Sequence, residues 1–280
     1  MRHLATESLV RPLSELCQRI SFELPKDIRR ALTEAARKES NLRAQEILQI
    51  LLANLEVAER DRVPLCQDTG MIVVWAQIGQ DLCLEGSLRA AVDQAVAQTC
   101  EEARLRPSML SHPLNRASNT GDNTPAFIHL ELVPGDQLTL HVAAKGGGSE
   151  NMSAVWMMSP SQGREGLIEA VVGRVREAGG RPCPPLVLGL GVGGNFETAP
   201  LLAKQALFRS LGDRSPDPVL ADLEAEILAR VNATGIGPLG LGGDTTALAV
   251  HAVAGPCHLA TMPVALNMQC HAARHGTLVI

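Results

Sequence analysis

The spacing of apolar residues changes about sixty residues into the chain. Before that point apolar residues recur with the helical period in three segments, 13–20, 25–39 and 41–61. Pro25 suits the first turn of the second segment. After it, the run MIVVWAQIG (71–79) predicts a strand. We therefore expect an α+β fold, with a helical N-terminal region followed by mixed strands and helices.

The rest of the chain alternates between helical and strand-like patterns. Helices are predicted over 87–105, 164–179, 197–209 and 218–235, and strands over 126–133, 137–144, 185–194, 246–255 and 258–268. Pro-Gly-Asp between the strands 126–133 and 137–144 predicts a hairpin. We find no repeat or linker, so a single domain is expected over residues 1–280. The chain ends on an apolar strand-like run, which suggests cover by a partner chain, although an edge strand of the core would have the same pattern.

Composition excludes several functional classes. Charged residues make up 20% of the chain, the net charge is −5, and the aromatic residues are four Phe and two Trp with no Tyr. We expect no nucleic-acid binding, which favours basic surfaces and stacking aromatics. No apolar run approaches the roughly 18 residues of a membrane span, and no signal-peptide core is present. The expected compartment is the cytoplasm, without membrane association.

The seven cysteines fall into groups. An odd number at irregular spacings without a signal peptide argues against a disulfide framework. Cys17 and Cys100 lie on apolar helix faces and are expected in the core, and Cys83 and Cys257 favour the same interpretation. The other three lie between predicted elements and are here named the junction cysteines: Cys66, Cys183 and Cys270.

A rigid junction suits metal ligation, because ligands need fixed geometry. No local C-x-x-C pair supports the site. Three thiolates suit a [4Fe–4S] cluster better than zinc, and leave one iron open as a Lewis acid. Gln67 and Asp68 follow Cys66 directly, so they would contact the substrate. The loop 106–121 is long enough to be functional, and the glycine run KGGGSEN (145–151) could cradle an anion through its backbone.

Four motifs, PLCQDTG, KGGGSEN, RPCPP and MQCHAAR, resemble class I (iron–sulfur) fumarate hydratases and the related L-tartrate dehydratases. The resemblance covers nearly the whole chain and is to the N-terminal domain, or to the alpha subunit of two-subunit members. It implies that the junction cysteines hold one [4Fe–4S] cluster. It also implies that the substrate, a small dicarboxylate, is bound by Gln67, Asp68, Arg106 and the backbone around Gly148.

The same resemblance places the remaining catalytic residues in a second domain that this chain lacks. We therefore expect a separate beta subunit, in an α2β2 assembly. The expected reaction is the reversible hydration of fumarate to L-malate, with Asp68 exchanging a proton with the hydroxyl. Lys145 and the run Ser149–Asn151 favour fumarate; L-tartrate and mesaconate are the alternatives. His271 stands where the family has a large apolar residue.

Three rival functions remain. GLGVGG (189–194) matches a dinucleotide-binding fingerprint of a dehydrogenase, but the predicted second strand with its acidic end is missing, so we interpret the glycines as a turn. Cys257, His258, Cys270, His271 and His275 suggest a zinc site, although no C-x₂-C pair is present. A non-catalytic scaffold subunit is the third alternative.

Overall fold

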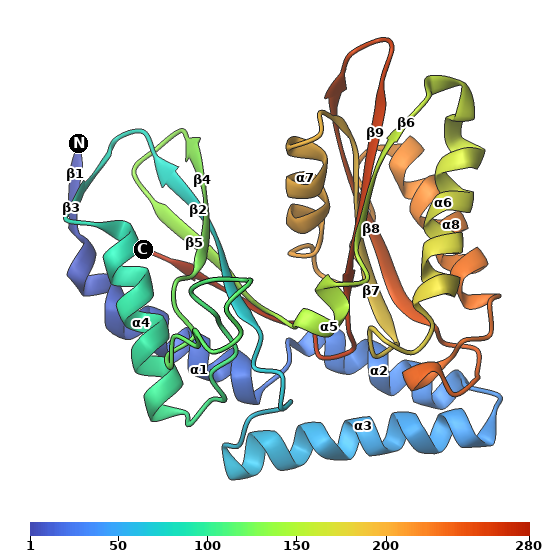
Figure 1. Ribbon diagram of the computed structural model, residues 1–280, viewed down its shortest axis with the longest axis horizontal. Helices are drawn as coiled ribbons and strands as arrows, with labels where there is room; N and C mark the ends of the chain where they lie inside the picture. The colour runs from blue at the N-terminus through green and yellow to red at the C-terminus, as the bar shows by residue number, and fades with distance from the viewer. The chain divides into compact units, whose positions relative to one another are not determined.

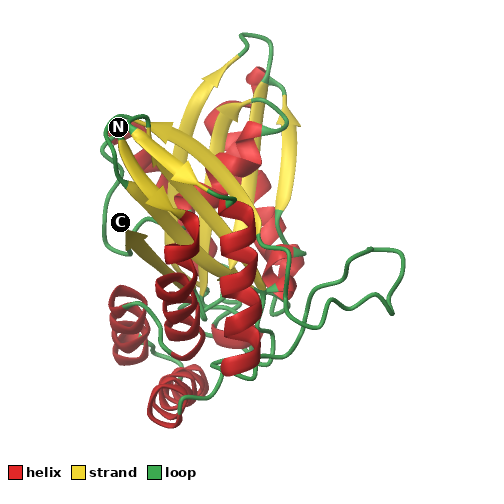
Figure 2. Ribbon diagram, turned by 90° about the vertical axis from the view of Figure 1, so that its left-hand side faces the viewer, coloured by secondary structure: helices red, strands yellow, loops and turns green.

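The computed structural model describes every residue from 1 to 280. The chain divides into two compact units, and neither is a continuous stretch of sequence. Unit 1 comprises Met1–Pro25, Asn54–Gly147 and Ala272–Ile280, and unit 2 comprises Lys26–Ala53 and Gly148–His271. Each unit contains a four-stranded sheet with helices (Figures 1 and 2), which confirms the α+β fold. That both units form one domain over 1–280 stays a prediction.

The sheet of unit 1 has the strand order β10–β5–β2–β4. Its strands are β2 (Met71–Gly79), β4 (Phe127–Val133), β5 (Leu138–Lys145) and β10 (Arg274–Val279). β2 pairs antiparallel with β5 and parallel with β4, so it separates two strands that are neighbours in sequence. The predicted hairpin of β4 and β5 is therefore wrong. The Pro-Gly-Asp turn is a local signal, and it carries no information about a central strand that inserts from elsewhere.

Helices α1 (Val10–Phe22) and α4 (Leu88–Glu102) pack together in unit 1. Their apolar stripes share a core with alternate residues of the sheet, among them Val74, Leu140 and Val142. The opposite face of the same strands carries Trp75, whose indole nitrogen donates to Glu131 at 2.8 Å. Apolar and polar residues alternate along these strands because successive side chains point to opposite faces, one buried and one polar. A small parallel ladder completes the unit with β1 (Arg2–Ala5) and β3 (Leu82–Glu85).

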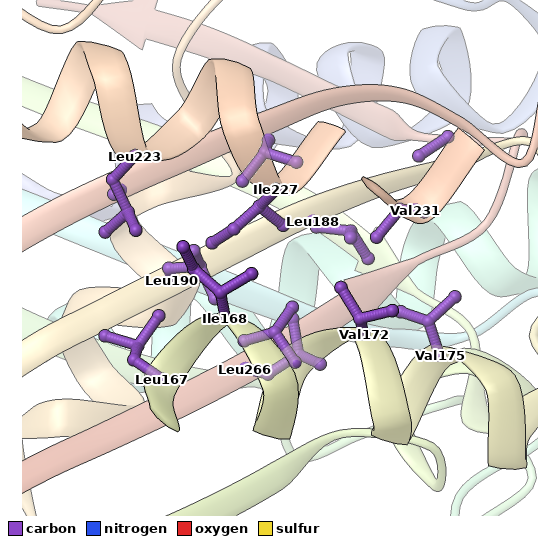
Figure 3. Close-up of a cluster of buried hydrophobic side chains, with 14 of the residues drawn as sticks. Leu167, Ile168, Val172, Val175, Leu188, Leu190, Leu223, Ile227, Val231 and Leu266 are labelled. Carbon is purple, nitrogen blue, oxygen red and sulfur yellow. The ribbon is translucent and has the colours of Figure 1, made fainter. Parts of the chain in front are cut away.

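The sheet of unit 2 has the order β6–β9–β7–β8. Its strands are β6 (Ala154–Met158), β7 (Leu186–Gly194), β8 (Ala247–Cys257) and β9 (Met262–Gln269). Helices α6 (Gly163–Ala178) and α8 (Pro218–Asn232) cover one face, and α7 (Thr198–Ala206) covers the other (Figure 1). Figure 3 shows the α6 and α8 side chains meeting Leu188 and Leu190 of β7. Each such fully buried leucine contributes about 1.5–3 kcal/mol of transfer free energy.

The glycines of GLGVGG lie inside β7, which ends at Gly194. A Cβ added to Gly191 would stand 2.0 Å from the carbonyl oxygen of Ala199, and one added to Gly189 would stand 2.2 Å from that of Ala203. These glycines therefore let the backbone of α7 approach the sheet. The predicted turn is wrong for most of the motif, because the turn between β7 and α7 falls after the glycines, at residues 195–197. In a dinucleotide fingerprint the glycines themselves form that turn.

The helical N-terminal region is confirmed by α1, α2 (Lys26–Lys38) and α3 (Leu42–Asp61). A single helical turn, α5 (Gly147–Glu150), follows β5. Short 3₁₀ turns occupy Thr6–Leu9, Pro160–Gln162 and Pro238–Gly240. None of the helices combines the length and the apolar character that a membrane crossing requires.

Candidate active site

The first candidate segment is the turn Cys66–Gly70 of unit 1, which leads directly into β2. The chain just before it is tied down, because Leu65 donates its N–H to Ser21 and its carbonyl accepts from the Asn54 amide. Gly70 has φ +78°, and a Cβ there would lie 2.8 Å from the Lys145 carbonyl oxygen. Only glycine fits both the conformation and the space. The Thr69-Gly70 pair is thus a steric requirement of the turn.

Asp68 is fixed by backbone donors on both of its carboxylate oxygens. Oδ1 accepts from the N–H of Gly70 at 3.0 Å, and Oδ2 accepts from the N–H of Gly147 at 2.8 Å. Each carboxylate oxygen can accept a second hydrogen bond. The carboxylate is therefore held in one orientation and keeps acceptor capacity for a ligand. Gly147 belongs to the glycine run, so two of the sequence motifs meet at this side chain.

The Arg106 segment is attached to the same turn. The carbonyl of Arg106 accepts from the hydroxyl of Thr69 at 2.6 Å and from the amide of Asn123 at 3.2 Å. Asn123 is 3% exposed, has φ +63°, and its Oδ1 also accepts from the N–H of Ser108 at 2.5 Å. The long loop after α4 is therefore built around a buried asparagine. Sequence analysis missed this residue, because Asn in a Gly-Asp-Asn-Thr-Pro stretch reads as an ordinary turn residue.

These segments enclose a cavity of about 370 Å³ within unit 1. Its lining residues are Gln67, Asp68, Gly70, Met71, Arg106, Ser108, Met109 and Gly147. The structure thus brings together Gln67, Asp68 and Arg106, as the sequence predicted. Gly148 itself begins a segment of unit 2, and its neighbour Gly147 contributes to the lining. Ser108 and Met109 were not predicted, although both lie in the loop that was singled out.

The guanidinium of Arg106 is exposed and makes no hydrogen bond or ion pair within the chain. Most arginines near carboxylates would form such pairs at the surface. A cation that projects from an anchored backbone into a cavity, without an internal partner, suits a carboxylate ligand bound by two parallel hydrogen bonds.

The junction cysteines are divided between the units. Cys66 belongs to unit 1, and Cys183 and Cys270 belong to unit 2. Neither unit by itself holds three or more His, Cys, Asp or Glu side chains arranged for a metal ion. The convergence of the three sulfurs on one cluster stays a prediction.

Within unit 2, His271 joins the other two cysteine segments. Its backbone N–H lies 3.2 Å from the Cys183 carbonyl oxygen, and its ring Nδ1 lies 3.0 Å from the same atom. Cys183 has φ +56°, a left-handed conformation that non-glycine residues seldom adopt. The histidine that departs from the family pattern thus supports the strained backbone of one junction cysteine, immediately beside the other.

The remaining cysteines separate by burial. Burial raises the pKa of the Cys17 thiol to about 12 and also raises the pKa of Cys100, where Asp122 adds to the effect. Burial therefore favours the thiol form of both side chains and shields them from a ligand. Both are buried, as predicted from their helix faces. The junction cysteines are exposed or half-buried, and none forms a disulfide.

The zinc interpretation is not compatible with unit 2. Cys257 ends β8 at the tip of the β8–β9 connection, whereas Cys270 follows the opposite end of β9. Eight residues of strand separate these positions by about 26 Å at about 3.3 Å per residue. Thiolate and imidazole ligands of one zinc ion lie within about 2.3 Å of it.

Comparisons with known proteins agree with the motifs. The family described as fumarate hydratase (Fumerase) matches residues 10–279. The "Putative L(+)-tartrate dehydratase subunit alpha" of Methanocaldococcus jannaschii is 41% identical over 269 residues, covering 94% of this chain and 94% of the relative. The L(+)-tartrate dehydratase subunit alpha of Escherichia coli strain K12 is 30% identical over 279 residues, covering 99% and 92%. The chain therefore belongs to the fumarate hydratase (Fumerase) family of hydro-lyases, together with these alpha subunits.

Proposed function

We propose that this chain is the cluster-bearing alpha subunit of an L(+)-tartrate dehydratase. The observation that carries the proposal is the unit 1 cavity, where an anchored carboxylate (Asp68), an amide (Gln67) and an unpaired guanidinium (Arg106) line one space. A hydroxy-dicarboxylate presents the complementary groups. Its carboxylate pairs with Arg106, and its hydroxyl bonds to Asp68 or Gln67.

Asp68 is the residue proposed to move a proton. In dehydration, the departing hydroxyl takes a proton from an oxygen of the Asp68 carboxyl group, and in hydration the carboxylate takes it back from water. The backbone N–H groups of Gly70 and Gly147 hold both oxygens, so the group does not have to reorient between the two directions. Loss of one water from tartrate gives an enol that becomes a keto acid, and no redox partner is needed.

The junction cysteines fit a [4Fe–4S] cluster by their donor chemistry. They are three thiols outside the core and free of disulfides, whereas Cys17 and Cys100 are buried in the core. Cys66, Cys183 and Cys270 would hold the cluster. When bound, it would supply a Lewis acid for the leaving hydroxyl. This chain's own contribution is the thiolate set, the carboxylate clamp at Arg106 and the proton at Asp68.

The relatives' names favour tartrate over the fumarate interpretation of the sequence. That interpretation rested on Lys145 and on Ser149–Asn151. Lys145 is 2% exposed and does not line the cavity, and Ser149 is 3% exposed. Glu150 is paired with Lys204 at 2.8 Å. Burial of Lys145 and Ser149 and the ion pair of Glu150 give these three residues structural roles that do not require contact with the substrate. Hydration of fumarate stays the second candidate, because the family as a whole is described by that activity.

The partner is a separate beta subunit. The relatives are named "subunit alpha", and they match this chain over nearly their whole length. The base that removes the carbon-bound proton, and the clamp for the second carboxylate, are proposed to come from that subunit. An α2β2 assembly is the simplest closed arrangement of two such pairs. The proposed compartment is the cytoplasm.

The test is an anaerobic assay of the reconstituted chain with and without a candidate beta subunit. Three substrates are compared: L-tartrate, fumarate and mesaconate. We expect turnover only with both subunits, and the highest kcat/KM with L-tartrate. Turnover by the lone chain on the order of 10 per second would contradict the half-enzyme proposal. A higher kcat/KM with fumarate would favour the second candidate.

A further inference from the structure

Arg274, the first residue of β10, is a buried cation without a counter-ion. It is 2% exposed and pairs in the ladder with Ala144 of β5. Its Nη2 donates to the carbonyl oxygen of Asp68 at 2.8 Å. Its Nε is buried without any hydrogen-bond partner, and no carboxylate forms an ion pair with the guanidinium.

Such an arrangement is costly in a protein that binds nothing there. Charges are buried when they are paired and hydrogen-bonded, and a lone buried charge is strongly destabilising. Arg274 contacts Asp68 through the backbone carbonyl, and the Asp68 carboxylate oxygens accept instead from the N–H groups of Gly70 and Gly147. The unpaired buried charge is therefore that of Arg274, whose Nε has no hydrogen-bond partner in the chain.

Two anions are available under the proposed function: the substrate carboxylates and a cluster held by thiolates. Arg106 already presents a guanidinium to the cavity, whereas Arg274 does not line it. Arg274 instead holds the backbone of Asp68, which is two residues from Cys66. Two residues span at most about 7 Å. The buried charge thus lies behind the turn that carries the first junction cysteine.

We infer that Arg274 is the buried counter-charge of the iron–sulfur cluster at Cys66, an inference that rests on the proposed function. It is a positioning residue: it fixes the Asp68 carbonyl and stabilises the anionic, thiolate-bound state. Loss of a group that orients a metal-ligating segment from outside the ligand shell typically lowers metal affinity by about 10- to 100-fold. The negative charge of the bound cluster therefore offsets the free-energy cost of burying the guanidinium.

The experiment compares Arg274→Met with Arg274→Lys in the full chain, first cluster-free and then loaded with iron and sulfide. Met has a similar volume and no charge, whereas Lys keeps the charge. We expect cluster-free Arg274→Met to unfold at the same temperature as the natural chain or higher. Its affinity for the cluster should fall at least about tenfold, and the reduction potential of the bound cluster should become more negative. Arg274→Lys should restore most of the uptake.

Arg209→Met is the matched control. Arg209 also has a buried Nε without a partner, but its guanidinium is paired with Glu224 in unit 2. Its replacement should lower the unfolding temperature of the cluster-free chain and leave cluster affinity unchanged.

Three results would overturn the inference. Arg274→Met could destabilise the cluster-free chain and still bind the cluster with natural affinity, which would make Arg274 purely structural. It could load normally but weaken L-tartrate binding to the complex with the beta subunit, which would make the substrate the anion. If the natural chain itself takes up no cluster, the proposed function fails together with the inference. Measuring cluster uptake by the natural chain, without any variant, distinguishes this failure of the proposed function from a failure of the inference.

Discussion

Replacement of Asp68 by asparagine tests the central side chain of the candidate site. An asparagine has one acceptor oxygen, and its NH₂ group only donates. In this structure one backbone N–H points at each carboxylate oxygen, from Gly70 at 3.0 Å and from Gly147 at 2.8 Å. Whichever way the amide turns, one backbone donor loses its acceptor. An unsatisfied donor costs about 1–3 kcal/mol. Loss of a positioned proton donor should lower kcat by about 10²- to 10⁴-fold.

The assay has three readouts: urea unfolding of the cluster-free chain, iron and sulfide content after loading, and turnover with the beta subunit. We expect a stability loss of about 1–3 kcal/mol, unchanged cluster content and near-complete loss of turnover. Asp217→Asn is the matched control. Asp217 caps α8 through a single bond from the Val219 N–H to Oδ1, which asparagine can replace at the same position. Its stability should be unchanged.

Two outcomes would contradict this reasoning. Natural stability in Asp68→Asn would mean that the two backbone bonds contribute nothing to folding. Loss of the cluster together with turnover would assign Asp68 a structural role rather than a catalytic one.

Three further predictions concern the rest of the chain. Serine at any junction cysteine should abolish cluster uptake and activity, whereas Cys17→Ala should not; an active serine variant would refute the ligand assignment. Gly191→Ala places a Cβ 2.0 Å from a carbonyl oxygen and should cost up to about 3 kcal/mol, whereas Gly173→Ala, in open helical space, should stabilise by about 0.4–1 kcal/mol in urea unfolding. Burial lowers the pKa of His141, against the opposing effect of Glu131. The unfolded chain therefore binds the proton more readily, and unfolding free energy should fall as the pH drops below about 6.5. His141→Gln should reduce that slope, and an unchanged slope would assign it to other groups.

Local pattern was sufficient for individual elements. The helical period of the apolar residues predicted α1 and α3, because each helix buries one side. The continuous apolar run 71–79 matches the bounds of β2. Pairing was not predictable. Nothing in the residues of β4 and β5 reveals that β2 lies between them. The glycines of β7 were read as a turn, since sequence does not show that a helix backbone lies against them.

The candidate site was predicted to the extent that its residues lie in motifs. Gln67, Asp68 and Arg106 were identified, and they line one cavity. Asn123 lies outside the motifs, and Arg274 closes the motif MQCHAAR but was given no role, because the importance of both comes from burial and from contacts with residues distant in sequence. Neither property can be inferred from residue type: an asparagine in a loop and an arginine in a strand are both usually exposed.

The discontinuity of the two units constrains how the chain can fold during synthesis. β10 lies beside β5 in unit 1, and the pair Arg274–Ala144 is separated by 274 − 144 = 130 residues. All of the sheet of unit 2 lies between them in the chain. A ribosome therefore releases unit 2 before the sheet of unit 1 can gain its last strand. Long-range pairing of this kind is slow and leaves a strand edge exposed. During that interval β5 offers an unpaired edge, which makes it the segment that a chaperone or a second nascent chain would encounter.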